Sequence, residues 1–123
     1  MSGDSPTVLG FPRSRRLKQQ GEFARARAQG RRVVCGCLIA NVLPRPGQLE
    51  TRLGVVTGKK VGNAVARSRA RRLMRESFRL HQHELAGPVD LVLVARPSIA
   101  GRKLAEVERD FLRVARQAGI GSQ

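Results

Sequence analysis

Apolar positions along the chain follow two different spacings. Continuous apolar runs rich in Val, Leu and Ile are typical of buried strands, and they occur at 33–43, 51–57 and 89–95. Apolar residues three and four positions apart are typical of helices with one buried face, and they occur at 13–30, 63–87 and 104–119. The chain therefore predicts the order helix, strand, strand, helix, strand, helix.

Turn residues between these segments indicate how the segments are joined. The sequence PRPGQLE after the first apolar run has turn chemistry throughout, so the first two strands are expected to pair antiparallel. Gly30 and Gly119 are plausible ends for the first and last helices. No linker or internal repeat divides the chain, which predicts a single domain over 13–119 between terminal tails at 1–12 and 120–123.

Each predicted helix has an apolar face that can pack on a core. In the first helix this face contains Leu17, Phe23, Ala24 and Ala28. In the second it contains Ala66, Ala70, Leu73, Ser77 and Leu80, with Met74 at its margin. In the last it contains Leu104, Val107, Phe111, Val114 and Ala118, and the opposite side mixes Glu106, Glu108 and Asp110 with arginines in a pattern typical of a solvated face.

The middle helix carries the strongest charge signal. KKVGNAVARSRARRLMRESFR, residues 59–79, contains eight Lys or Arg residues against one acid, Glu76, and every arginine lies off the apolar stripe. Guanidinium groups match phosphate oxygens two at a time, so this face predicts a polyanionic partner. A solvated basic helix and a membrane-binding helix are the alternatives, but the opposite face is mostly alanine, which favours nucleic acid over a membrane.

Composition agrees with this interpretation and limits it. The chain has 123 residues and a net charge of +15, which makes it attractive to RNA, DNA and anionic surfaces. No apolar run approaches the length of a membrane span, and MSGDSPTVLG lacks the pattern of a signal peptide, so we expect a cytoplasmic protein.

The sequence predicts no catalytic or metal site in the polypeptide itself. The acids are scattered, and His81 and His83 are two positions apart on a helix, where they face different directions. Cys35 and Cys37 are expected to be small buried thiols on one strand face. No glycine-rich phosphate loop or nucleophile motif is present.

The residues of the basic stretch also resemble a family signature. KKVGNAVARSRARRLMRESFR is similar to the motif of the bacterial ribonuclease P protein component, and RLKQQGEFARARAQG and VDLVLVARP resemble that family's first helix and last strand. The resemblance extends from about Arg13 to Ala118. One position departs from the motif, since Ser68 stands where the family has asparagine.

This resemblance implies a fold and a function. The fold would be an α/β (α+β) two-layer sandwich with a small mixed sheet, similar to a domain of a small-subunit ribosomal protein. Its strand, helix, strand crossover would be left-handed, against the usual right-handed rule. The function would be that of the protein subunit of a ribonucleoprotein endonuclease, in which a catalytic RNA holds Mg²⁺ and removes the 5′ leader of precursor tRNA.

The resemblance further implies two RNA-binding surfaces, with no membrane and no obligate protein partner. The surface for the catalytic RNA would comprise Lys59, Lys60, Asn63, Arg67, Ser68, Arg69, Arg71, Arg72 and Arg75. The surface for the precursor tRNA leader would comprise Phe23, Arg27 and Asn41, although Phe23 is equally explained as a core residue. A ribosome-associated or general RNA-binding structural protein and a stand-alone nuclease remain the alternative functions.

Overall fold

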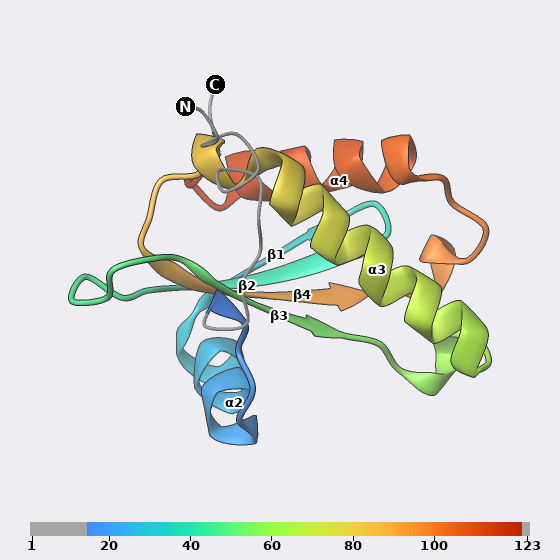
Figure 1. Ribbon diagram of the computed structural model, residues 1–123, viewed down its shortest axis with the longest axis horizontal. Coiled ribbons are helices and arrows are strands. Elements are labelled where there is room, and N and C mark those ends of the chain that lie inside the picture. The colour runs from blue at the N-terminus through green and yellow to red at the C-terminus, as the bar shows by residue number, and fades with distance from the viewer. Residues whose placement is uncertain (1–14, 122–123) are drawn as a thin grey trace, which may run out of the picture.

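Three helices and a four-stranded sheet account for most of residues 15–121, which are the residues that the computed structural model describes (Figure 1). In chain order the elements are α2 (Gln20–Gln29), β1 (Arg31–Cys35), β2 (Leu38–Pro44), β3 (Arg52–Val56), η2 (Lys59–Val61), α3 (Ala64–His81), η3 (Gln82–Glu84), β4 (Val89–Ala95), η4 (Pro97–Ile99) and α4 (Leu104–Gln117). The predicted order of helices and strands is confirmed, with one predicted strand divided in two. The predicted tail at 1–12 lies outside the described residues.

The sheet is mixed, with strand order β1-β2-β4-β3. β1 pairs antiparallel with β2 and β2 with β4, whereas β3 and β4 are parallel. The predicted antiparallel pairing of 33–43 with 51–57 is therefore wrong, because β4 lies between them: Leu91 is opposite Val42 on one side and Leu53 on the other. β4 lies inside the sheet, between β2 and β3, because six of its seven side chains are apolar and all but Val94 are buried.

The predicted single strand at 33–43 is wrong as well, because the chain reverses at Gly36. This glycine has a φ of 61°, and a side chain there would overlap the carboxylate of Asp110. That carboxylate accepts a hydrogen bond from the Cys37 backbone N–H at 2.9 Å. Cys35 and Cys37 therefore flank a hairpin turn, and burial together with Asp110 raises the pKa of the Cys37 thiol to about 12.

The helices cover both faces of the sheet. α3 and α4 lie side by side on one face, and α2 lies against the other (Figure 1). β3 runs in front of β4 in this view and α3 crosses above both, so the path from β3 to β4 turns anticlockwise as it recedes from the viewer. The crossover is left-handed, as the resemblance implied.

The buried faces of two helices are rotated from their predicted positions. In α3 the buried residues are Ala70, Met74, Ser77 and Phe78, while Ala66, Leu73 and Leu80 are only partly buried. Met74 is at the centre of this face, and both Met74 and Phe78, one turn later, are completely buried in the core. In α2 only Ala26 is buried, and Ala24 and Ala28 are exposed.

The last helix packs as predicted, with two exceptions. Val107, Phe111 and Val114 are buried, but so is Asp110, which was expected on the solvated face. Asp110 is drawn inward because it satisfies the backbone of the β1–β2 turn. Ile120 is also buried and accepts a hydrogen bond from Ala86 N–H at 2.7 Å, so the domain extends beyond the predicted boundary at 119.

A buried carboxylate holds α2 and the β2–β3 loop against the sheet. Burial acts to raise the pKa of Asp90, but hydrogen bonds from Arg52 and Gln48 and the charge of Arg45 outweigh it and lower the pKa. Arg52 also pairs with Glu22 of α2 at 2.7 Å. These contacts fix α2 relative to β3.

At the end of α3, His81 lies between two carboxylates. Its Nδ1 is 2.7 Å from Glu84 and its Nε2 is 2.5 Å from Glu108 of α4. Burial acts to lower the pKa of His81, but these two hydrogen bonds outweigh it and raise the pKa. His81 therefore joins α3 to α4 most strongly when protonated.

No helix within 15–121 is long and apolar enough to cross a membrane.

A pH dependence of stability follows from this contact. Because the folded-state pKa is raised above 6.5, the contribution of His81 is complete below that pH and is lost as pH rises through the folded-state pKa. We expect His81→Gln to lower the free energy of unfolding by roughly 0.2–1 kcal/mol near pH 6 and by less near pH 8.5. Urea unfolding across this range measures the gap, with the exposed His83→Gln as control. A gap that widens with rising pH would contradict the assignment.

Candidate nucleic-acid interface

The basic stretch begins with a single 3₁₀ turn that leads into α3. Lys59 and Lys60 occupy this turn, η2, and are both exposed. Asn63 is the N-cap of α3, and its Oδ1 accepts a hydrogen bond from Ala66 N–H at 2.9 Å. The side chain of Asn63 therefore caps the N-terminus of α3. This capping role gives a local structural reason for an asparagine at this position. Gly62 has a φ of 145°, which a residue with a side chain rarely adopts.

The arginines of α3 spread over its whole outer side. Arg67, Arg71 and Arg75 are four positions apart. Arg71 Nη1 donates to Thr57 Oγ1 at 2.7 Å and Arg75 lines a cavity with Gly54 and Val55, so both lie toward β3, while Arg67 Nη1 donates to the Gly62 carbonyl at 2.8 Å. Arg69 lies on the side toward α4 and donates to the Arg102 carbonyl at 2.7 Å. Arg72 is exposed between these two sides, on the outermost part of the helix, which we call the crest of α3.

Ser68 lies on the same crest, one turn before Arg72. It is exposed, and its Oγ accepts a hydrogen bond from Arg71 Nη2 at 3.1 Å. Ser68, which stands where the family has asparagine, thus orients the guanidinium of Arg71. Its short hydroxyl is long enough to reach that group.

These positive charges are not neutralised within residues 15–121. The ion pairs there join carboxylates to Arg15, Arg45, Arg52, Arg79, His81 and Arg102, and none includes Lys59, Lys60 or an arginine between 67 and 75. Burial and the neighbouring charges of Arg16 and Arg71 lower the pKa of Arg75. A concentration of guanidinium groups without carboxylates is a surface that a polyanion would stabilise.

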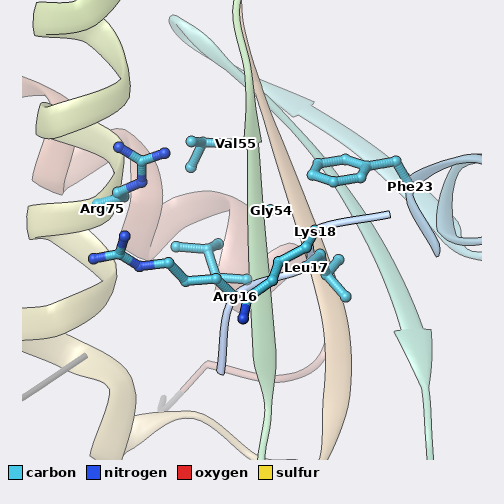
Figure 2. Close-up of a pocket in the computed structure, with 8 residues that line it drawn as sticks. Arg16, Leu17, Lys18, Phe23, Gly54, Val55 and Arg75 are labelled. Carbon is cyan, nitrogen blue, oxygen red and sulfur yellow. The ribbon is translucent and has the colours of Figure 1, made fainter. Parts of the chain in front are cut away.

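A cleft on the other side of β3 contains the predicted leader-binding phenylalanine. Phe23 projects from α2 onto Gly54 of β3, so closely that a methyl group at Gly54 would overlap the ring (Figure 2). The ring is half buried and packs with Leu17 and Val92, yet it also lines two surface cavities of about 370 and 360 Å³. Phe23 is therefore both a packing residue and a wall of the cleft.

The cleft continues along α2 toward the end of the sheet. Arg27, one turn after Phe23, is exposed and lines both the second cavity and a third of about 490 Å³. The third cavity also includes Lys59 and Lys60, so the cleft meets the start of the basic stretch. Asn41 is not part of this wall: it lies on β2 opposite Val92 and is only 3% exposed.

The contact between Phe23 and Gly54 gives a test of the cleft geometry. Gly54→Ala is expected to lower the free energy of unfolding by about 1 kcal/mol, because the added methyl group has no space beneath the ring. The same substitution in a Phe23→Ala background should cost less, since the obstruction is gone. Thermal or urea unfolding of the two single variants and the double variant measures this coupling. Additive losses would contradict the contact.

Comparison with known proteins identifies the family of the chain. A sequence model of the family described as Ribonuclease P matches residues 11–119. The chain belongs to the ribonuclease P protein family. The ribonuclease P protein component of Gluconacetobacter diazotrophicus is 39% identical over 109 residues, which cover 88% of this chain and 94% of that protein. The component from Halalkalibacterium halodurans is 35% identical over 105 residues, covering 85% and 88% of the two chains.

Solved structures of ribonuclease P proteins share the fold. The protein from Staphylococcus aureus superposes with a TM-score of 0.80 at 24% identity, covering 88% of this chain and 98% of that one. The protein from Thermotoga maritima gives a TM-score of 0.75 at 22% identity, covering 83% and 96%. The α+β architecture implied by the sequence motif is thus the architecture of this ribonuclease P family.

Two residues near these surfaces were absent from the sequence-based prediction. Arg16 and Lys18 precede α2 and line the cavity that contains Phe23 and Arg75. Their only signal in the sequence was the basic character of the segment from Arg13 onward. Their place beside β3 depends on a contact between distant parts of the chain: Leu17 N–H donates to the Leu53 carbonyl at 2.8 Å.

Proposed function

We propose that this chain is the protein subunit of ribonuclease P and assists the endonucleolytic removal of the 5′ leader from precursor tRNA. The basic face of α3, with Lys59 and Lys60 before it, binds the catalytic RNA. The cleft between α2 and the sheet, with Phe23 and Arg27, takes the single-stranded leader. The observation that carries this proposal is a row of arginines on α3, from Arg67 to Arg75, that no carboxylate within residues 15–121 neutralises.

The distribution of carboxylates supports a positioning role for the polypeptide. Asp90 is held by arginines, Asp110 by the β1–β2 turn, and Glu108 by His81. No group of three or more His, Cys, Asp or Glu residues within 15–121 is arranged to hold a metal ion. In this proposal the RNA subunit would hold the Mg²⁺ ions, which would supply the nucleophilic water and stabilise the leaving oxygen.

The protein's own contribution is electrostatic and geometric. Guanidinium groups on α3 lower the repulsion between phosphates that the folded RNA brings together. The half-buried Phe23 ring offers a face on which a leader base can stack without a requirement for sequence. Holding the leader at a fixed distance from α3 places the scissile phosphodiester relative to the catalytic RNA.

Reconstitution tests this proposal. Purified protein, catalytic RNA from a bacterial ribonuclease P, and Mg²⁺ are combined with precursor tRNA, together with reactions that omit the protein or the RNA. We expect the protein to increase cleavage by the RNA at low Mg²⁺ and to have no activity alone. Cleavage by the protein without RNA would contradict the proposal, and so would a protein that binds the RNA without affecting cleavage, as a general RNA-binding protein would.

A further inference from the structure

A pocket of about 370 Å³ lies across the outer edge of β3, between the two proposed RNA surfaces. Its lining comes from three separate parts of the chain: Arg16 and Lys18 before α2, Gly54 and Val55 on β3, and Arg75 on α3. Phe23 closes its other end. Three cations therefore surround an apolar floor, and none of the lining residues is acidic.

The backbone holds Arg16 in place at this pocket. Arg16 forms a parallel β-bridge with Leu53, and the Leu17 N–H donates to the Leu53 carbonyl at 2.8 Å. Successive side chains of an extended segment point to opposite sides, and Leu17 is buried in the cluster beneath α2. Arg16 consequently points toward α3. Figure 2 shows its guanidinium on the same side of β3 as that of Arg75, with Phe23 on the opposite side.

The charges in this pocket favour an anion. Burial lowers the pKa of Arg75, and the nearby charges of Arg16 and Arg71 lower it further. Like charges held together in partly buried positions repel one another, and a bound anion removes that repulsion. Two guanidinium groups can bind a phosphate through several charge-assisted hydrogen bonds, while Lys18 adds a point charge. The pocket is open at the surface, so a phosphate within a continuous strand can enter.

We propose that this pocket binds one backbone phosphate of RNA between Arg16 and Arg75. It thereby joins the Phe23 cleft to the basic face of α3 around the edge of β3, and the two surfaces form one continuous path. The proposal rests on the proposed function as a ribonuclease P subunit. The phosphodiester comes either from the precursor leader or from the catalytic RNA, and the two sources give different results in the test below.

The test uses Arg16→Gln in the reconstituted particle, with Arg113→Gln on the exposed side of α4 as a control of equal charge. Three affinities are measured: protein for catalytic RNA, particle for precursor tRNA, and particle for mature tRNA. We expect Arg16→Gln to weaken at least one of these by about tenfold, the loss of one charge-assisted contact. Lys18→Gln serves as a second variant, because Lys18 is exposed and its substitution leaves the β-bridge intact. Thermal unfolding verifies that both variants fold.

The pattern of losses identifies the source of the phosphate. If the leader supplies it, the loss is confined to precursor tRNA, and a single methylphosphonate in the leader abolishes the difference between wild type and Arg16→Gln. If the catalytic RNA supplies it, binding of the protein to that RNA weakens, its salt dependence falls by about one phosphate contact, and both tRNAs are affected equally. Both patterns support the pocket.

Two results would overturn the proposal. In the first, Arg16→Gln and Lys18→Gln both fold and match Arg113→Gln in all three affinities, which rejects the pocket while the function stands. In the second, the wild-type protein itself binds neither the catalytic RNA nor the particle's substrate, which rejects the proposed function and the pocket with it.

Discussion

Replacing Arg69 and Arg72 together with glutamine is expected to weaken binding of the protein to the catalytic RNA by about a hundredfold at low salt. Arg72 is exposed on the crest of α3, and Arg69 lies beside it on the side toward α4. Each guanidinium lost removes a phosphate contact and the counterions that the contact releases. The slope of log affinity against log salt should therefore fall by about two. Filter binding over a range of salt concentrations measures both quantities.

A double substitution on α4 provides the matched control for this experiment. Arg109→Gln with Arg113→Gln removes the same two charges from an exposed face that is not part of the basic stretch. A general effect of net charge would weaken both double variants equally, whereas a specific contact surface weakens only the variant on α3. Equal losses, or an unchanged salt slope for the α3 variant, would remove α3 from the interface.

Phe23→Ala is expected to reduce the affinity of the particle for precursor tRNA much more than its affinity for mature tRNA. Stacking of a base on an aromatic ring contributes about 1–3 kcal/mol, and mature tRNA has no leader base to stack. The half-buried ring lies on Gly54 with one side in the cleft, which is the geometry that such stacking requires. Equilibrium binding to both tRNAs measures the difference.

The packing role of Phe23 needs its own control, since the ring also contacts the cluster beneath α2. Phe23→Leu keeps an apolar side chain over the sheet but has no aromatic face, so it should fold normally and still lose the preference for precursor. Thermal unfolding establishes the fold of each variant. Equal losses for precursor and mature tRNA with Phe23→Leu would assign the residue to the core alone.

Long periodic segments of the sequence predicted the fold well. β4 and α4 occupy the residues expected. A short apolar run favours a buried strand, and apolar residues at sustained steps of three and four favour a helix with one buried face. α3 begins after Asn63 as predicted, and its arginines lie outside the buried face. The family motif supplied the left-handed crossover, which general rules of connectivity would have drawn with the opposite hand.

Features that depend on distant contacts could not be predicted in this way. The run VVCGCLIANVL is apolar on both sides of Gly36, so nothing in its spacing distinguishes one long strand from a hairpin. Asp110 has the surroundings of a solvated helix face in the sequence, and only the turn at Cys37 gives it a buried partner. The parallel pairing of β3 with β4 likewise depends on the path of α3, which local sequence does not encode.

The residues of the candidate site divide in the same way, into those that local sequence predicts and those that depend on distant contacts. Charge density and spacing were sufficient to name the arginines of α3, since both are local properties. Asn41 was assigned to the leader surface only from the family resemblance of the first predicted strand. In the structure its side chain is buried, on β2 opposite Val92. Arg16 was overlooked because it reaches Arg75 only through the pairing of its backbone with β3.

Site-directed photo-crosslinking in the reconstituted particle tests the central claim most directly. A photoreactive side chain is placed at Arg72 on the crest of α3 or at Arg113 on α4, and each particle is irradiated with the catalytic RNA bound. The account predicts crosslinks to the catalytic RNA from position 72 and none from position 113. Crosslinks from position 113 in the absence of any from position 72 would contradict it.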